Sequence, residues 1–181
     1  MREALAQATR KTVRASGGRP VRLENLHVTL AFLGSVRESR LPELAQIAQK
    51  AAQLAGPGGT SSPHQLLELT LEHLEHWRPA QLLCAVPAER PTSAIALARS
   101  LQDLLAEPAF AADLEGSRSG GVDITQPFRP HVTLARRVYR SPRTIEMQPI
   151  TWGFTDFALV DSRTLPEGAV YTVLEKFPLE L

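Results

Sequence analysis

Three stretches of the chain carry apolar residues at helical spacing. In residues 2–15 the spacing is loose, and the stretch ends at Ser16-Gly17-Gly18, a sequence that stops helices. Residues 41–54 repeat the spacing more regularly, through Leu44 and Ile47, and a glycine-rich loop follows at 56–59. Residues 91–106 form the third stretch, in which Pro91 suits a first helical turn. The pattern therefore predicts three helices.

Alternating or continuous short apolar runs predict strands in the rest of the chain. The expected strands are 25–33, 65–74, 81–86, 128–136, 151–160 and 170–177, with turn residues at 161–168 and a Gly/Ser-rich loop at 116–121. Each half of the chain then holds a helix and several strands. This arrangement is an α+β pattern with weak internal duplication.

One pentapeptide, His-Val-Thr-Leu-Ala, occurs twice, at 27–31 and at 131–135. Successive side chains of a strand point to opposite faces, so the histidine and threonine of each copy share a face. Two such strands side by side would direct two imidazoles and two hydroxyls into one space. Residues of these types favour acid–base chemistry on a small anion.

A histidine pair can hold a neutral base and a protonated acid together near neutral pH. Displacement at phosphorus needs such a pair on opposite sides of the phosphorus atom. The hydroxyls of Thr29 and Thr133 could donate hydrogen bonds to the non-bridging oxygens. Arg136 follows Thr133 by three residues and lies on the opposite face of an ideal strand, so it reaches the site only if the strand ends, bulges or twists.

Charge is distributed unevenly although the formal net charge is only +1. The small net charge argues against a protein that coats nucleic acid. However, residues 1–22 hold six basic residues and one acidic residue, and residues 129–143 hold five arginines and no acid. Both segments adjoin a copy of the pentapeptide, which indicates a positive field around one site.

Other candidate chemistry is weaker. Cys84, the single cysteine, excludes an internal disulfide and lies in an apolar run, as expected for a buried, inert thiol. His73 and His76, with Glu72 and Glu75 nearby, could suggest a metal site. The leucine alternation there predicts a strand, in which residues three apart face opposite ways, so we expect surface histidines and no metal. No secretory signal or membrane-spanning apolar stretch is found, and we expect a cytoplasmic protein.

The two copies, preceded by Glu24-Asn25-Leu26 and by Arg129-Pro130, resemble the paired motifs of the 2H phosphoesterase superfamily. Within it the chain is similar to the bacterial RNA 2′,3′-cyclic phosphodiesterases, also called 2′-5′ RNA ligases. The likeness extends to residues 32–34, 154–160 and 171–174. The motifs are specific as a pair, whereas either alone is a weak signal.

The resemblance implies one domain over residues 1–181 with a two-lobed, pseudo-twofold α+β fold. Two antiparallel sheets, flanked by helices, would surround a central cleft that both motifs face. The chain starts directly in a helix, whereas members of this family usually begin with an apolar strand. We therefore expect either that this strand is missing, which would expose a sheet edge, or that another segment fills its place.

The resemblance also implies metal-independent hydrolysis, with no cofactor, of RNA 2′,3′-cyclic phosphate ends to 2′-phosphomonoesters. By this analogy His27 is the general acid and His131 the general base, although the residues themselves leave the order open. Thr29 and Thr133 become phosphate ligands and Arg136 a substrate contact. The expected partners are RNA ends or nucleotides bearing a 2′,3′-cyclic phosphate, and the protein is expected to be a monomer.

Three alternatives remain at this level. The chain could join RNA through 2′-5′ linkages, cleave 2′-5′ linked oligonucleotides, or bind RNA without catalysis. A broad stacking platform for RNA is poorly supported, because only a few aromatic residues lie near the motifs: Phe32, Phe128 and Tyr139.

Overall fold

The computed structural model describes residues 1–55, 67–107, 127–142, 146–165 and 168–179. Within these ranges the three predicted helices are confirmed as α1 (Arg2–Ala15), α2 (Leu41–Leu54) and α3 (Thr92–Leu105). Pro91 is the N-cap of α3. Their agreement with the sequence follows from clear stop signals and regular apolar spacing, both of which are local properties.

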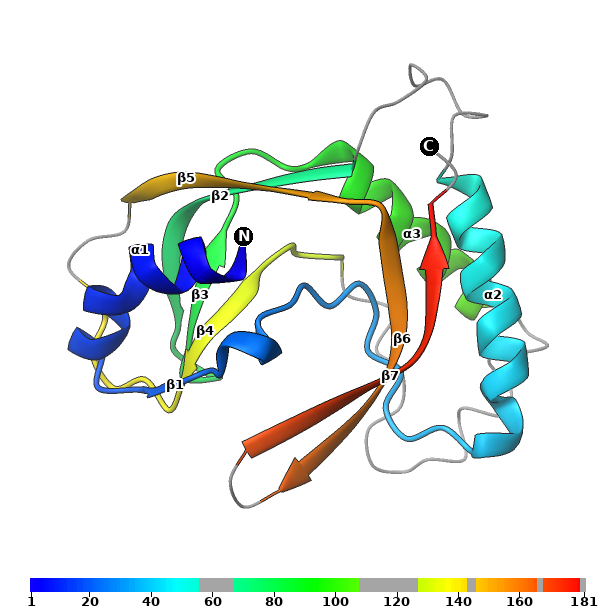
Figure 1. Ribbon diagram of the computed structural model, residues 1–181, viewed down its shortest axis with the longest axis horizontal. Helices are drawn as coiled ribbons and strands as arrows, with labels where there is room; N and C mark the ends of the chain where they lie inside the picture. Colours follow the sequence, from blue (N-terminus) through cyan, green and yellow to red (C-terminus); the bar gives the residue numbers. More distant parts are fainter. Residues whose placement is uncertain (56–66, 108–126, 143–145, 166–167, 180–181) are drawn as a thin grey trace.

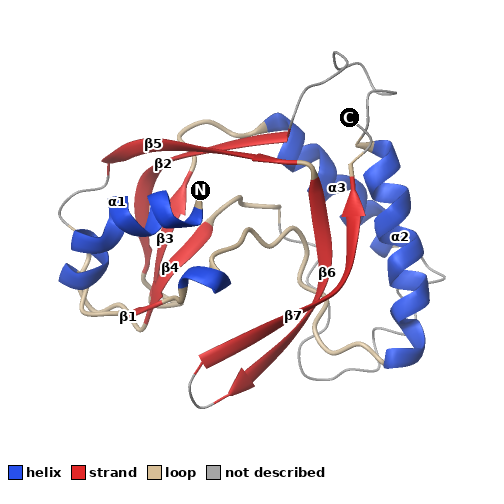
Figure 2. Cartoon of the chain, in the orientation of Figure 1, coloured by secondary structure: helices blue, strands red, loops and turns tan. Residues whose placement is uncertain are grey.

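The described strands form two antiparallel sheets (Figures 1 and 2). The larger sheet has the order β1-β4-β3-β2-β5, and the smaller pairs β6 with β7. The bounds are β1 (Arg19–Pro20), β2 (Leu67–Trp77), β3 (Leu82–Val86), β4 (Val132–Arg136), β5 (Glu146–Phe154), β6 (Asp156–Leu165) and β7 (Gly168–Pro178). The predicted α+β fold with two antiparallel sheets is thus confirmed.

Helix α1 covers one face of the five-stranded sheet. Leu5 of the helix packs in one apolar cluster with Leu71, Leu83 and Val132 from three neighbouring strands. All four side chains are fully buried. Because strand side chains alternate, the other face of β2, β3 and β4 is left for the residues between these core positions.

A second apolar cluster joins α2 and α3 to the two-stranded sheet. Ala51 of α2, Leu97 of α3 and Phe177 of β7 all belong to it. Figure 1 shows α2 and α3 side by side next to β6 and β7, at the opposite end of the molecule from α1. The first cluster is thus centred on the five-stranded sheet, and the second joins the two-stranded sheet, α2 and α3 to Leu67 of β2. A third, smaller cluster of the described residues contains Leu44 and Leu105.

The predicted strand at 25–33 is wrong. Residues Leu23–Asn25 form a short 3₁₀ helix, and residues 26–33 belong to no strand. The alternation is nevertheless real, because Leu26 is buried and Val28 and Leu30 are partly buried against the two cores. Alternation reports which side chains are buried. It does not provide the hydrogen-bonded neighbour that a strand requires.

Other boundaries differ from the sequence expectation. The strand predicted at 151–160 is two strands that meet at Thr155, and the turn expected at 161–168 is a continuous strand as far as Leu165. The pairing of Asp161 with Thr172 shows why: a long partner strand keeps these polar residues in the ladder. The loop predicted at 116–121 lies outside the described residues. In the described part of the chain, no helix is long and apolar enough to span a bilayer.

Candidate active site

His27 follows the 3₁₀ helix and is held by its own backbone. Its Nδ1 lies 2.7 Å from the carbonyl oxygen of Asn25. A carbonyl only accepts hydrogen bonds, so Nδ1 carries the proton and Nε2 is left for other partners. The ring of Tyr171 on β7 lies edge-on to the imidazole, 4.7 Å between centroids.

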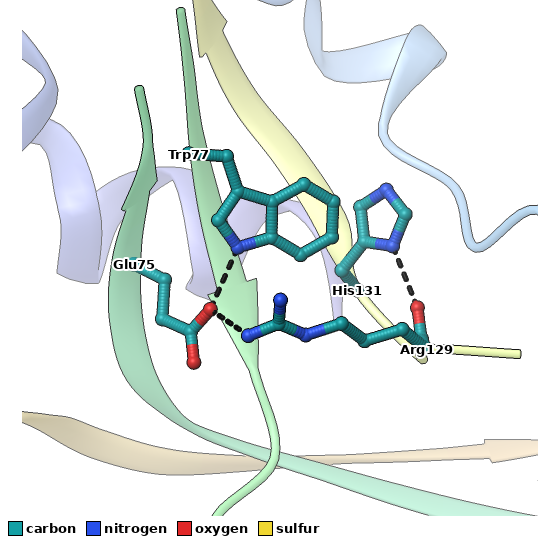
Figure 3. Close-up of polar contacts among 4 residues, drawn as sticks. All are labelled: Glu75, Trp77, Arg129 and His131. Atoms are coloured by element: carbon teal, nitrogen blue, oxygen red, sulfur yellow. Dashed lines mark hydrogen bonds and ion pairs between the residues drawn. The ribbon is translucent and has the colours of Figure 1, made fainter. Parts of the chain in front are cut away.

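His131, the residue before β4, has a matching environment. Its Nδ1 donates to the carbonyl oxygen of Arg129 over 2.8 Å, and the Trp77 ring on β2 lies 4.4 Å from the imidazole centroid. Figure 3 shows the second ring nitrogen directed away from Arg129. Each imidazole thus lies between an aromatic ring and a backbone carbonyl that binds its Nδ1 atom. Its Nε2 atom is left for chemistry.

The two imidazoles interact electrostatically although they come from different halves of the chain. Burial is the main cause of a lowered pKa at His131, and the positive charges of Arg129 and His27 lower that pKa further. The hydrogen bond to the Arg129 carbonyl and the carboxylate of Glu75 act in the opposite direction. The structure therefore brings the two predicted histidines together, with His131 biased towards its neutral form.

Thr29 lies two residues after His27 in the same extended segment. Its side chain is exposed, while Val28 and Leu30 on either side of it pack against the cores. Thr29 is consequently on the side of the segment that carries His27. The burial of the flanking residues agrees with the predicted shared face, although the segment is not a strand, and the role of Thr29 at the site stays a prediction.

Strand register places Arg136 on the same face as Thr133. Trp77 pairs with Leu82 and Leu82 with Arg136, whereas Glu75 pairs with Cys84 and Cys84 with Thr133. Because paired residues share a face, and Glu75 and Trp77 are two residues apart, Thr133 and Arg136 also share a face. The ladder between β3 and β4 shifts register at Leu83/Cys84, so Leu134 is an extra residue on β4. This bulge removes the doubt about Arg136 that the sequence spacing raised.

This face of the sheet is named here the His131 face, and it includes Glu75, Trp77, Leu82, Cys84, Thr133 and Arg136. Cys84 is fully buried there, and burial raises the pKa of its thiol to about 12. The thiol is hydrogen-bonded to the Thr133 hydroxyl. Cys84 therefore remains a neutral thiol at physiological pH, as its apolar sequence context predicted.

Glu75 and Arg129 form an ion pair beside His131 (Figure 3). The same carboxylate oxygen accepts a hydrogen bond of 2.6 Å from Nε1 of Trp77. The guanidinium of Arg129 lies over the Trp77 ring, 4.7 Å from its centroid. A carboxylate, an indole and a guanidinium thus surround one side of the histidine.

Sequence reasoning missed Trp77 and gave Tyr171 no part in the site. Neither ring stands near the histidine that it contacts in the sequence, so no local signal links Trp77 to His131 or Tyr171 to His27. Of the two histidines once considered as metal ligands, His76 makes a 2.9 Å hydrogen bond with Ser141. The described residues bring together no group of three or more His, Cys, Asp or Glu that could hold a metal ion.

Comparison with known proteins agrees with the motifs. The sequence profile of the LigT-like phosphoesterases matches residues 2–57, which include the first motif. An RNA 2′,3′-cyclic phosphodiesterase of Thermus thermophilus is 35% identical over 99% of this chain and 84% of its own length. The chain belongs to the LigT-like phosphoesterase family.

Two further members of the comparison extend over most of this LigT-like chain. An RNA 2′,3′-cyclic phosphodiesterase of Escherichia coli is 30% identical over 90% of the chain and 80% of its own length. A crystal structure of a Thermus thermophilus protein superimposes with a TM-score of 0.72 at 32% identity, covering 99% of this chain and 91% of that one. The resemblance stated from the paired motifs is thereby confirmed.

Proposed function

We propose that this LigT-like phosphoesterase hydrolyses 2′,3′-cyclic phosphate ends of RNA to 2′-phosphomonoesters, with His27 as general acid and His131 as general base. The observation that carries the proposal is the matched pair of imidazoles. Each donates Nδ1–H to a carbonyl two residues earlier and leaves Nε2 for chemistry. The names of the two curated relatives support the choice of substrate.

In the proposed reaction the Nε2 atom of His131 accepts a proton from a water molecule. The water oxygen attacks phosphorus, and the bond from phosphorus to the 3′-oxygen breaks in line with the attack. His27 gives its Nε2 proton to that oxygen, so a free 3′-hydroxyl and a 2′-phosphate result. The lowered pKa of His131, caused mainly by burial, suits a resting base.

Thr29, Thr133 and Arg136 are proposed as phosphate ligands. The hydrogen bond between the Thr133 hydroxyl and the Cys84 sulfur holds the threonine side chain on the face where the phosphate would bind. Arg136 shares the face of Thr133 and would add positive charge where the transition state is most negative. The proposal needs no metal ion. A single domain over residues 1–181, a monomer and a cytoplasmic location stay predictions.

The test compares His27→Ala and His131→Ala with the wild type on a short RNA that ends in a 2′,3′-cyclic phosphate. Each change should lower kcat about a hundredfold to ten-thousandfold, because each removes an acid–base group. The matched control is His76→Ala, since His76 pairs with Leu83 on the helix-covered face of the sheet and should retain activity. Rates with and without EDTA should be equal.

Several outcomes would contradict the proposal. RNA binding with turnover absent from the wild type would favour a noncatalytic module, and loss of activity in EDTA would favour a metalloenzyme. Faster cleavage of 2′-5′ oligoadenylate than of the cyclic end, or joining of RNA fragments, would favour the alternative activities. A 3′-phosphate product would show that the 2′-oxygen leaves.

A further inference from the structure

The residue two positions before each histidine has a double role. Asn25 accepts the Nδ1 proton of His27 with its carbonyl, and its side-chain Nδ2 donates to the carbonyl of Ala169 on β7 over 2.9 Å. Arg129 accepts the Nδ1 proton of His131 with its carbonyl, and its guanidinium pairs with Glu75 on β2. In both cases the backbone that orients an imidazole is tied by its own side chain to a strand.

The strand that receives each tie also supplies the aromatic ring against the imidazole. Tyr171 follows Ala169 by two residues on β7, and its ring faces His27. Trp77 follows Glu75 by two residues on β2, and its ring faces His131. On β2 the side chains of Glu75 and Trp77 share a face, because residues two apart on a strand point the same way; on β7 the Ala169 contact is made by the backbone carbonyl. The two halves thus repeat one arrangement with different side chains.

We propose that Asn25 and Arg129 are positioning residues for His27 and His131, and that Glu75 completes the His131 arrangement by holding Arg129 against Trp77. The inference rests on the proposed function, because it assigns these residues to the two groups that carry it. Each tie prevents rotation of the carbonyl that fixes Nδ1 as the protonated nitrogen. None of these residues is required to contact the phosphate.

The two arrangements differ in charge, and this difference makes the inference testable. The tie at His27 is a neutral amide, whereas the tie at His131 is an ion pair of opposite charges. The groups whose charges act on His131 are Arg129 on its own segment, Glu75 on β2 and His27 from the other half. The side chains of Arg129 and Glu75 are 62% and 37% exposed, so their pairing contributes little to overall stability.

The experiment follows the titration of His131 by NMR of ¹⁵N-labelled histidine, together with the pH dependence of kcat/KM on a 2′,3′-cyclic mononucleotide. Glu75→Gln leaves the Arg129 charge uncompensated and should move both the His131 midpoint and the low-pH limb to lower pH. Arg129→Met leaves the Glu75 charge uncompensated and should move both to higher pH. The double variant should return towards the wild-type position.

Three comparisons separate positioning from a general structural effect. Arg129→Lys keeps the charge and should keep the low-pH limb near its wild-type position. Glu107→Gln is the matched control. It breaks an exposed ion pair between Lys50 of α2 and Glu107, which follows α3, and it should change neither readout. Asn25→Ala should lower kcat about tenfold with little change in KM, because a misdirected imidazole loses alignment without losing substrate.

The inference is overturned if the His131 midpoint and the low-pH limb shift in the same direction in Glu75→Gln and Arg129→Met. It is also overturned if Arg129→Met changes KM alone, because Arg129 would then be a substrate ligand. The NMR readout does not need turnover. If the wild type fails to hydrolyse the cyclic phosphate while the His131 midpoint still moves in opposite directions, the proposed function fails and the positioning of His131 stands.

Discussion

At the scale of single residues, a backbone carbonyl decides which nitrogen of each imidazole is available for chemistry. The carbonyls of Asn25 and Arg129 each accept a proton from Nδ1, so the lone pair of a neutral ring is on Nε2. Burial then decides charge, since it disfavours the imidazolium form of His131. The same effect keeps the Cys84 thiol protonated, with its pKa raised to about 12.

The pH dependence of kcat/KM should show the lowered pKa of His131. A base whose pKa is depressed stays neutral to lower pH, so the low-pH limb should fall below the value of about 6.5 for an ordinary histidine. Because burial is the largest cause, raising the salt concentration should move this limb little. The limbs report the coupled pair of histidines. A low-pH limb above the ordinary histidine value would contradict the assigned base.

At the scale of elements, the bulge at Leu134 decides the composition of the His131 face. In an unbulged strand Thr133 and Arg136 would point in opposite directions. The extra residue reverses the alternation between them, so both side chains share the face that carries Glu75 and Trp77. One register shift therefore places the guanidinium of Arg136 on the same face as the hydroxyl of Thr133. The sequence spacing alone would have placed them on opposite faces.

Arg136→Ala should raise KM for the cyclic phosphate about tenfold to a hundredfold, the effect of losing a charge-assisted hydrogen bond. Steady-state kinetics over a range of substrate concentrations measures this. The control is Arg137→Ala, which removes the same charge from the next residue, where the backbone has left the strand with φ at 55°. Equal effects of the two changes would indicate a general loss of positive field and would contradict a directed contact.

The turn between α1 and β1 should tolerate no side chain at Gly18. An added Cβ would lie 2.7 Å from Cγ2 of Val138 and 3.0 Å from the carbonyl oxygen of Arg136. Gly18→Ala should therefore lower the free energy of unfolding by about 1–3 kcal/mol, measured by urea denaturation. Gly17→Ala is a milder comparison of about 1 kcal/mol, because Gly17 has φ at 68° but only an ordinary contact with Tyr139. Equal stability of wild type and Gly18→Ala would mean that the turn relaxes freely.

At the scale of the whole molecule, the two histidines contact aromatic rings from different sheets: His27 lies against Tyr171 on β7, and His131 lies against Trp77 on β2. Phe154 packs partly buried against both clusters, and Thr155 is the single residue between β5 of one sheet and β6 of the other. Among the described residues, Phe157 packs against the second cluster and not against the first. The position of β7, and with it Tyr171, relative to the five-stranded sheet therefore depends in part on the packing around Phe154.

Phe154→Ala should lower kcat/KM about tenfold at temperatures well below unfolding, because a small displacement between the halves misaligns acid and base. Phe157→Ala should cost a similar amount of stability, about 2 kcal/mol, while the rate is retained. Kinetics and thermal unfolding on the same samples separate the two effects. Equal rates for the two variants would show that the halves keep their alignment without Phe154.

Local properties were predictable from the sequence, and properties of pairing were not. Helix α2 was predicted with its observed bounds because its apolar spacing and its following glycine loop are both local. The segment after Asn25 has the alternation of a strand, but its hydrogen-bond partner is not encoded in that alternation. The polar residues around Asp161 predict a turn, but pairing with β7 makes them part of a strand.

The amino-acid sequence by itself determined which chemical groups are available for catalysis: two histidines, each two residues before a threonine, in a repeated pentapeptide with apolar residues between them. Tertiary structure decided which other groups act on them. Arg129 meets Glu75 across 54 positions of sequence and Asn25 meets Ala169 across 144. Side-chain identity and periodicity are local, whereas register, burial and electrostatic neighbours depend on how distant segments pack. This physical difference explains why the two motifs could be predicted from the sequence and the residues around them could not.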